Sequence, residues 1–319
     1  MEVRKLQLIG GSSYMISLPK DWIRSNELKQ GDEILLQISE NSITVYPKKF
    51  IEDLRVTRVK VDKIPRLDEK FIRRYIFALY IQGIDEIVIE DKNVNARVIS
   101  KISEIVKQLI GMEIIDASEG RIVLKCLATT DFDFYGVIKR MTQIISSMLS
   151  TIHECLKLGD LEGLKELSNL ENDSDRLYLL AIRQEHRLVK ELSTPNKWDE
   201  LKLILGVRTV AKLLEEIADS LNEFSEQVSS SYSKFENIIL DLRKAFENVS
   251  KAYITSDMEL SEDSIELLEN IEEKILKEMK NENEQNKIAL HSLLSACRYM
   301  KSIGEIAFNK SVRETLPVK

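Results

Sequence analysis

The sequence predicts a multidomain, mainly helical protein with a small β domain first, a compact α/β domain second and a long helical region last. Residues 1–50 hold short alternating apolar segments separated by turn signals, and residues 51–130 alternate between strand and helix patterns. In residues 131–319 apolar residues recur at helical spacing, and Pro195 is the one proline before Pro317. At 319 residues the chain is long enough for these domains.

The first fifty residues have the pattern of two short hairpins around one helix. Gly10 and Gly11 break the first alternating run, and Pro19 opens a helix in which Trp22 and Ile23 point inward. The expected strands are 3–9, 14–18, 34–39 and 43–46, the helix is 20–27, and the second hairpin turns at 40–42. Such a unit is too small to bury its apolar faces alone, so we expect it to intertwine with a second copy of itself.

The middle domain, residues 51–130, has the pattern of a compact α/β unit. Its expected strands are 54–61, 84–90, 113–117 and 121–127, and its expected helices are 68–82 and 95–110. This combination of four strands and two helices suggests a ferredoxin-like arrangement. No glycine-rich phosphate loop joins a strand to a helix in this domain, which leaves it a role as a linker or a dimerisation domain.

The helical region, residues 131–319, contains an internal duplication. Residues 170–177 align with 268–275, and residues 212–219 align with 298–305, in the same order in both halves. The sequence therefore predicts two three-helix repeats, about 131–228 and 229–315, stacked in tandem. A break between two helices is expected around Pro195.

The net charge of −7 is distributed unevenly along the chain. Residues 1–50 and 51–130 each carry a balance of +1, whereas residues 131–319 carry −9. The helical region would repel nucleic acid, and the N-terminal region can approach it. No apolar run reaches the length of a membrane span, and the N-terminus lacks the apolar segment of an export signal. We therefore expect a cytoplasmic protein without membrane insertion.

Two pairs of acidic residues are conspicuous in the first helical repeat. Glu171 and Asp175 are four residues apart, as are Glu215 and Asp219, so each pair shares one face of its helix. Like charges at this spacing are destabilising unless they are neutralised, and a cation held by carboxylate oxygens is one neutraliser. Salt bridges are the alternative, and three nearby cations offer them: Arg176, Arg208 and Lys212.

The helical region resembles the PhoU family. The resemblance rests on Gly159-Asp160, residues 171–178, Arg183-Gln184 and residues 208–219. It implies a bundle of two three-helix repeats, a part in the regulation of phosphate uptake and signalling, and, as in several members, bound metal. The ligands implied are Glu171, Asp175, Glu215 and Asp219, which would hold a divalent or iron-type metal ion.

The second repeat departs from the PhoU pattern. Lys301 stands where the motif has an acid, and Glu305 replaces the usual aspartate, near Glu269 and Glu273. The ammonium group of Lys301 can pair with Glu305 or Glu269, and it repels a divalent cation. We therefore expect a second metal site to be weak or absent.

The N-terminal residues resemble the swapped-hairpin domain of the AbrB and SpoVT group. The similarity runs from Arg4 and Lys5 through Pro19-Lys20 and Arg24 to Gly31-Asp32 and the hairpin that follows. In that group two chains interleave and present basic side chains to DNA, and the positions implied are Arg4, Lys5, Lys20 and Arg24. Their cationic groups suit phosphate contact, and arginine also suits base-edge readout. Two alternatives stay open: an ordinary surface, or a toxin-antidote type of domain that only dimerises.

These features predict a DNA-binding transcriptional regulator of phosphate uptake, a homodimer whose helical bundle senses metal, phosphate or a protein partner. Two other functions stay open. A PhoU-type protein without DNA binding would dock on a phosphate transporter ATPase or a sensor kinase, and a metal-dependent hydrolase would use the acidic pairs. The chain has no evident nucleophile beside a base and no phosphate-cradling loop, so we do not expect an enzyme.

Overall fold

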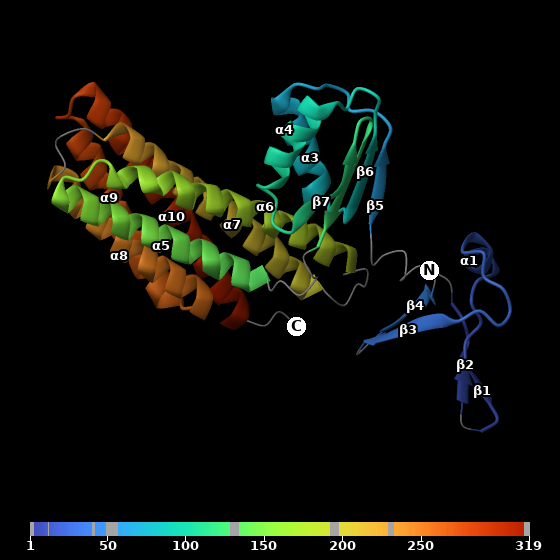
Figure 1. Cartoon of the computed structure of the whole chain (residues 1–319). Helices are drawn as coiled ribbons and strands as arrows, with labels where there is room; N and C mark the ends of the chain where they lie inside the picture. Colours follow the sequence, from blue (N-terminus) through green and yellow to red (C-terminus); the bar gives the residue numbers. More distant parts are fainter. Residues whose placement is uncertain are drawn as a thin grey trace. The chain divides into compact units, whose positions relative to one another are not determined.

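The computed structural model describes residues 3–11, 13–39, 42–48, 57–127, 134–191, 198–228 and 233–315. The chain divides into two compact units, of which the first ends at Thr57 and the second begins at Arg58. Both units are drawn in Figure 1. Among the helices of the described residues, none is long and apolar enough to cross a membrane.

The N-terminal unit contains, in its described residues, two antiparallel hairpins and a short helix. The elements are β1 (Gln7–Ile9), β2 (Ser13–Met15), α1 (Lys20–Ser25), β3 (Ile34–Ser39) and β4 (Ser42–Pro47). Gly10 and Gly11 have φ angles of 61° and 74°, left-handed values that permit the tight turn between β1 and β2. The expected elements are therefore present, although β1 and β2 are shorter than predicted. The turn residues 40 and 41 lie outside the described residues.

The second unit begins with an α/β domain. Its elements are β5 (Arg58–Val61), α3 (Glu69–Ile81), β6 (Glu86–Glu90), α4 (Ala96–Val106), β7 (Met112–Ser118) and β8 (Arg121–Cys126). Asp68 caps the N-terminus of α3 and Asn95 that of α4, and the side chain of each accepts a hydrogen bond from a backbone N–H of the first turn. Both helices lie against the sheet, as Figure 1 shows, and alternate strand residues such as Ile87 and Ile122 are fully buried beneath them.

The strand order of this domain corrects the ferredoxin-like expectation. The sheet has the order β5-β6-β8-β7, in which β5 and β6 are neighbours and parallel and the other pairs are antiparallel. Along the chain the elements run βαβαββ, whereas the ferredoxin-like order is βαββαβ. The predicted elements already run in this order, which by itself excludes the ferredoxin-like arrangement. Apolar periodicity does not encode the order of the strands within the sheet. Residues 54–56 of the first predicted strand lie outside the described residues.

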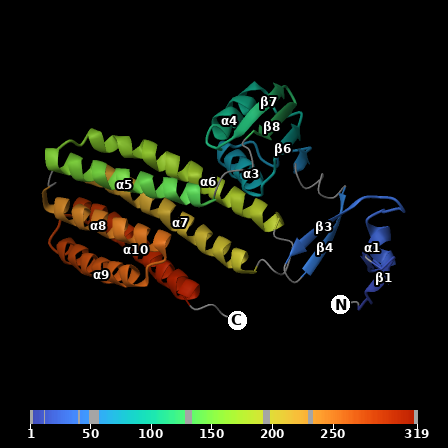
Figure 2. The same cartoon turned by 90° about the horizontal axis from the view of Figure 1, so that it is seen from below.

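The helical region follows in the same unit. Its elements are α5 (Phe134–Leu158), the 3₁₀ turn η1 (Gly163–Glu166), α6 (Leu167–Glu191), α7 (Trp198–Gln227), α8 (Ser233–Thr255), α9 (Met258–Met279) and α10 (Glu284–Thr315). Helix α7 packs against α5, α6 and α10, and α8 packs against α5, α9 and α10. Figure 2 shows these helices side by side. They share one core of buried aliphatic and aromatic residues, so the sets α5–α7 and α8–α10 form a single bundle.

The mainly helical, three-part fold class predicted from the sequence is confirmed by this architecture. The predicted helix break around Pro195 and the expected repeat boundaries at 131–133 and 229–232 lie outside the described residues.

Candidate metal centre and nucleic-acid interface

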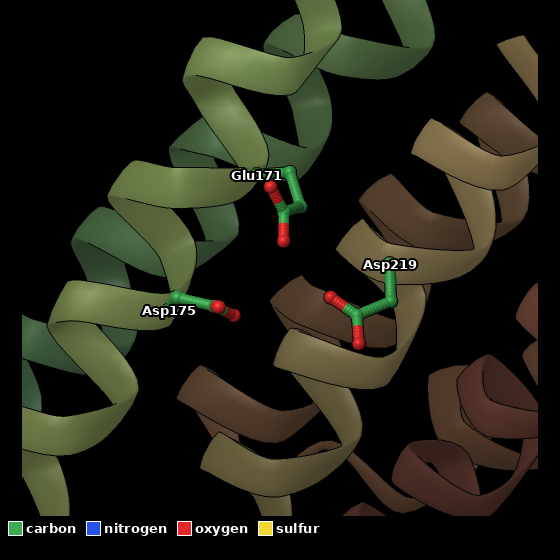
Figure 3. Close-up of side chains that lie close together, drawn as sticks. All are labelled: Glu171, Asp175 and Asp219. Carbon is green, nitrogen blue, oxygen red and sulfur yellow. The ribbon is translucent and has the colours of Figure 1, made fainter. Parts of the chain in front are cut away.

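Helices α6 and α7 bring acidic side chains together. The acids stand beside core positions, because their neighbours Ser174 and Ala218 are fully buried and α6 packs against α7. Figure 3 shows Glu171 and Asp175 of α6 and Asp219 of α7 pointing toward one another. One carboxylate oxygen from each of the three lies within 4.8 Å of the others. We call these three residues the carboxylate cluster.

Two oxygens of the carboxylate cluster are buried without a partner. Within the described part of the chain, Asp175 Oδ1 and Asp219 Oδ1 are shielded from solvent and form no hydrogen bond. Burial, together with the charges of Glu171 and Glu215, raises the pKa of Asp175 to about 6. Burial, together with the charges of Glu215 and Asp175, raises the pKa of Asp219 to about 7. For both carboxyls, burial and the neighbouring negative charges outweigh the opposing charge of Lys212.

The geometry of the carboxylate cluster fits a metal ion. Hard cations bind carboxylate oxygens at roughly 2.0–2.6 Å, so two ligand atoms on one ion are separated by at most about twice that distance. The 4.8 Å limit for the cluster lies within this range. Ligands that are all oxygen suit magnesium, calcium or manganese, and carboxylates also serve iron.

The fourth predicted ligand, Glu215, belongs to a second, overlapping group. Glu215, Glu216 and Asp219 also offer oxygens within 4.8 Å of one another. Lys212 Nζ contacts Glu215 Oε2 and lies 2.8 Å from Glu216 Oε1. Sequence reasoning did not single out Glu216, although its position three residues before Asp219 puts it near the same helix face.

The other two cations considered as neutralisers form different ion pairs. Arg176 lies 3.4 Å from Asp173, and Arg208 lies 3.0 Å from Glu185. Of the three, therefore, only Lys212 pairs in the described structure with a predicted ligand.

In the second repeat, cations occupy the corresponding place. Arg298 Nε lies 2.8 Å from Glu272 Oε1, and Lys301 Nζ lies 3.4 Å from Glu272 Oε2. Lys301 is also 3.8 Å from Glu269, one of its two expected partners, whereas the other, Glu305, is exposed. Burial opposes the shift, but the hydrogen bonds from Arg298 and Lys301 lower the pKa of Glu272.

In the second repeat the acid that contacts both Arg298 and Lys301 of α10 is Glu272. Glu273, which the sequence alignment places opposite Asp175, is exposed. Sequence reasoning did not single out Glu272, because core packing, not charge, fixes how a helix is rotated.

Helix α6 also holds the α/β domain. Arg183, with 2% of its side chain exposed, donates hydrogen bonds to the carbonyls of Tyr80 and Ile84 at 2.9 and 2.8 Å. It donates a further one to Asp85 Oδ1 at 2.6 Å, and Arg187 contacts the same carboxylate. We call Asp85, Arg183 and Arg187 the Asp85 network. It lies about two turns beyond Asp175 on the same helix, so α6 connects the carboxylate cluster with the α/β domain.

The four cations predicted to contact DNA are exposed on the N-terminal unit. Arg4 and Lys5 lie in the segment before β1. Lys20 and Arg24 lie four residues apart on α1 and so share one face of that helix. The structure thus brings Lys20 and Arg24 together, and it places Arg4 and Lys5 on a separate segment.

The apolar side chains of the N-terminal unit are largely exposed. Trp22 and Ile23, expected to point inward, are only half-buried, and α1 contains no buried residue. On the strands, the exposed fractions of Leu8, Tyr14 and Ile38 are 57%, 70% and 76%. A surface with this many exposed apolar side chains is typical of a region that packs against a partner.

Two family matches overlap the regions that carry these sites, although Arg4 and Lys5 precede the N-terminal match. Residues 138–228 match the PhoU domain. This PhoU-like region spans α5 to α7 and includes the carboxylate cluster, whereas α8 to α10 lie beyond it. Residues 7–53 match the family described as antidote-toxin recognition MazE, bacterial antitoxin. The two resemblances seen in the sequence are therefore confirmed, and the N-terminal one is to the antitoxin type. Both families are regulatory rather than catalytic.

Among solved structures, the crystal structure of PhoU from Pseudomonas aeruginosa is similar over 56% of this chain and 92% of that chain, with 14% identity and a TM-score of 0.45. No curated protein matches the chain. The family matches leave the α/β domain between them unassigned.

Proposed function

We propose that the protein is a homodimeric, DNA-binding transcriptional regulator of phosphate uptake, in which metal binding to the PhoU-like region is the sensed signal. One observation carries the proposal: a single chain joins a MazE/AbrB-like unit with exposed cations to a PhoU-like region with converging, partnerless carboxylate oxygens. The first feature suits DNA binding, and the second suits a sensor.

The proposed metal site explains the buried carboxylate oxygens. A divalent or iron-type ion would be held by Glu171, Asp175 and Asp219, with Glu215 available through the group that shares Asp219. The ion would tie α6 to α7. Because α6 also holds Asp85, a change in α6 would reach the α/β domain, which precedes it in the chain and follows the N-terminal unit. Regulation requires that metal-free and metal-bound forms differ in DNA affinity.

The exposed apolar side chains of the N-terminal unit support the homodimer. Their burial requires a partner surface, and a second copy supplies one of matching composition. A dimer would also double the set of exposed cations, as two DNA half-sites require.

The DNA-binding proposal is tested by the salt dependence of binding. The ligand is a duplex from upstream of the protein's own gene, and binding is followed by fluorescence anisotropy at several salt concentrations. A variant with Arg4→Ala, Lys5→Ala, Lys20→Ala and Arg24→Ala should bind more weakly, with a slope flatter by about one unit for each lost phosphate contact. Lys107→Ala with Lys165→Ala, two exposed cations of the second unit, is the control. An unchanged slope would exclude the four residues from the interface.

The metal proposal is tested by elemental analysis after supplementation with manganese, zinc or iron. Metal should be lost in Asp219→Ala and retained in Glu305→Ala, because Lys301 and Arg298 already hold the acid of the second repeat. Metal that survives Asp219→Ala but disappears with Glu305→Ala would place the site in the second repeat and contradict the proposal. If no sample contains metal, the acids of the first repeat are neutralised by salt bridges and the metal proposal fails.

The match to the MazE family favours a second candidate, a unit that dimerises in the manner of a toxin antidote without reading DNA. The helical bundle would then dock on a phosphate transporter ATPase or a sensor kinase. A stable dimer that shows no salt-dependent DNA binding would support this candidate. The hydrolase alternative predicts phosphatase activity with manganese, and we expect none.

A further inference from the structure

Lys212 is a cation beside the carboxylate cluster, and its charge acts to lower the pKa of both Asp175 and Asp219 against the effect of burial. It lies on α7, three and four residues before Glu215 and Glu216, and its Nζ contacts both carboxylates. The same Nζ lies 5.2 Å from the ring centre of Tyr178 on α6. About 43% of the Lys212 side chain is exposed. The Lys212 side chain therefore lies at the edge of the α6–α7 interface and is partly exposed to solvent.

The position of Lys212 divides the acids into two sets. Glu215 and Glu216 both pair with Lys212, whereas Asp175 and Asp219 each keep a buried oxygen without a partner. Asp219 belongs to both groups of close carboxylates. An ion that binds Asp219 together with Glu215 therefore competes with Lys212 for the carboxylate of Glu215.

The second repeat provides an internal comparison. The spacing of buried residues in α7 and α10, for example Leu214 and Met300, makes Arg298 the counterpart of Lys212. Arg298 and Lys301 both hold the single carboxylate of Glu272. There two cations lie beside two acids, Glu269 and Glu272, whereas in the first repeat one cation lies beside several acids and leaves them only partly neutralised.

We propose that Lys212 sets the strength of metal binding at the carboxylate cluster, as an internal counter-ion that a metal ion displaces from Glu215 and Glu216. This inference rests on the proposed metal site. The long, flexible side chain can swing into solvent when a divalent ion arrives, and the ammonium group opposes ions that bring too little charge to replace it. The lysine thus limits metal affinity and favours ions with two or more charges.

The test is calorimetric titration of metal-free, full-length protein with Mn²⁺. Lys212→Met keeps the length of the side chain beside Tyr178 and removes its charge, and it should bind Mn²⁺ about tenfold more tightly or better. Lys212→Arg, which keeps the positive charge, should bind Mn²⁺ as tightly as the wild type does. Arg298→Met, at the corresponding place of the second repeat, should leave the affinity unchanged. If Lys212→Met does not fold, Lys212→Gln takes its place.

The outcomes separate this inference from the metal site itself. If Mn²⁺ binds the wild type and Lys212→Met binds no more tightly, Lys212 is only a structural salt bridge and the inference is overturned, while the metal site stands. A salt-bridge role would instead lower the melting temperature of metal-free Lys212→Met without changing its affinity for Mn²⁺. If no variant binds Mn²⁺, the proposed metal site fails and the inference fails with it. If Lys212→Met binds Mn²⁺ and the wild type does not, the result supports the inference that Lys212 limits metal affinity.

Discussion

Replacing Asp219 by asparagine should stabilise the metal-free protein at neutral and alkaline pH. The folded protein holds this carboxyl in a buried place beside Glu215 and Asp175, which raises its pKa to about 7 from an ordinary value of 3.8. Deprotonating it in the folded state is therefore unfavourable. Asparagine has nearly the same shape and no charge, so the variant avoids this penalty.

The size of the effect follows from the pKa difference. A shift of about 3 units corresponds to about 4 kcal/mol at about 1.4 kcal/mol per unit. The carboxyl keeps part of its contact with solvent, which reduces the expected gain to about 1–2 kcal/mol. Because the folded-state pKa lies above the unfolded-state value, the contribution of this carboxyl to the stability of the wild type falls as the pH rises from about 4 to about 7. The variant should match the wild type near pH 4 and exceed it at pH 8.

The assay is thermal unfolding in the presence of a chelator between pH 4 and pH 8. Asp219→Asn should melt about 2–6 °C higher than the wild type at pH 8. Asp263→Asn, an exposed acid of α9, is the control and should not change the pH dependence. Adding Mn²⁺ should reverse the order, because only the wild type keeps the full set of ligands. A metal-free variant that melts at or below the wild type at pH 8 would show that Asp219 is already neutralised.

Three further predictions concern the dimer, the Asp85 network and metal removal. Sedimentation at low micromolar concentration should find a dimer, and Ile38→Lys should weaken it, because Ile38 is 76% exposed in the single chain; a stable folded wild-type monomer would contradict this. Arg183→Met should lower the free energy of unfolding in denaturant by about 3–5 kcal/mol, since it removes the charged hydrogen bonds to the carbonyls of Tyr80 and Ile84 and one of the two cations on Asp85; a loss below about 1 kcal/mol would mean that the network does not hold the α/β domain. Chelation of Mn²⁺-loaded protein should lower the melting temperature more at pH 8 than at pH 5, where Asp175 and Asp219 are largely protonated and bind metal weakly; an equal loss at both pH values would argue against these ligands.

The sequence by itself determined the features that depend on residues close together in the chain. Apolar spacing located the strands and helices, because helix and strand periods are local properties of the backbone. The four-residue spacing of Glu171 with Asp175 and of Glu215 with Asp219 showed which acids share a helix face. The exposed apolar faces of the N-terminal unit were also foreseeable, since its short elements cannot cover one another.

Only the tertiary structure decided how these faces combine. Core packing rotates α6 and α7 so that Asp219 meets Glu171 and Asp175, while Glu215 turns to Lys212. The sheet order, the use of Glu272 in place of Glu273 and the pairing of Asp85 with Arg183 also depend on contacts between distant segments. Local patterns cannot encode such contacts, because the free energy that selects them comes from burying side chains of one element against another.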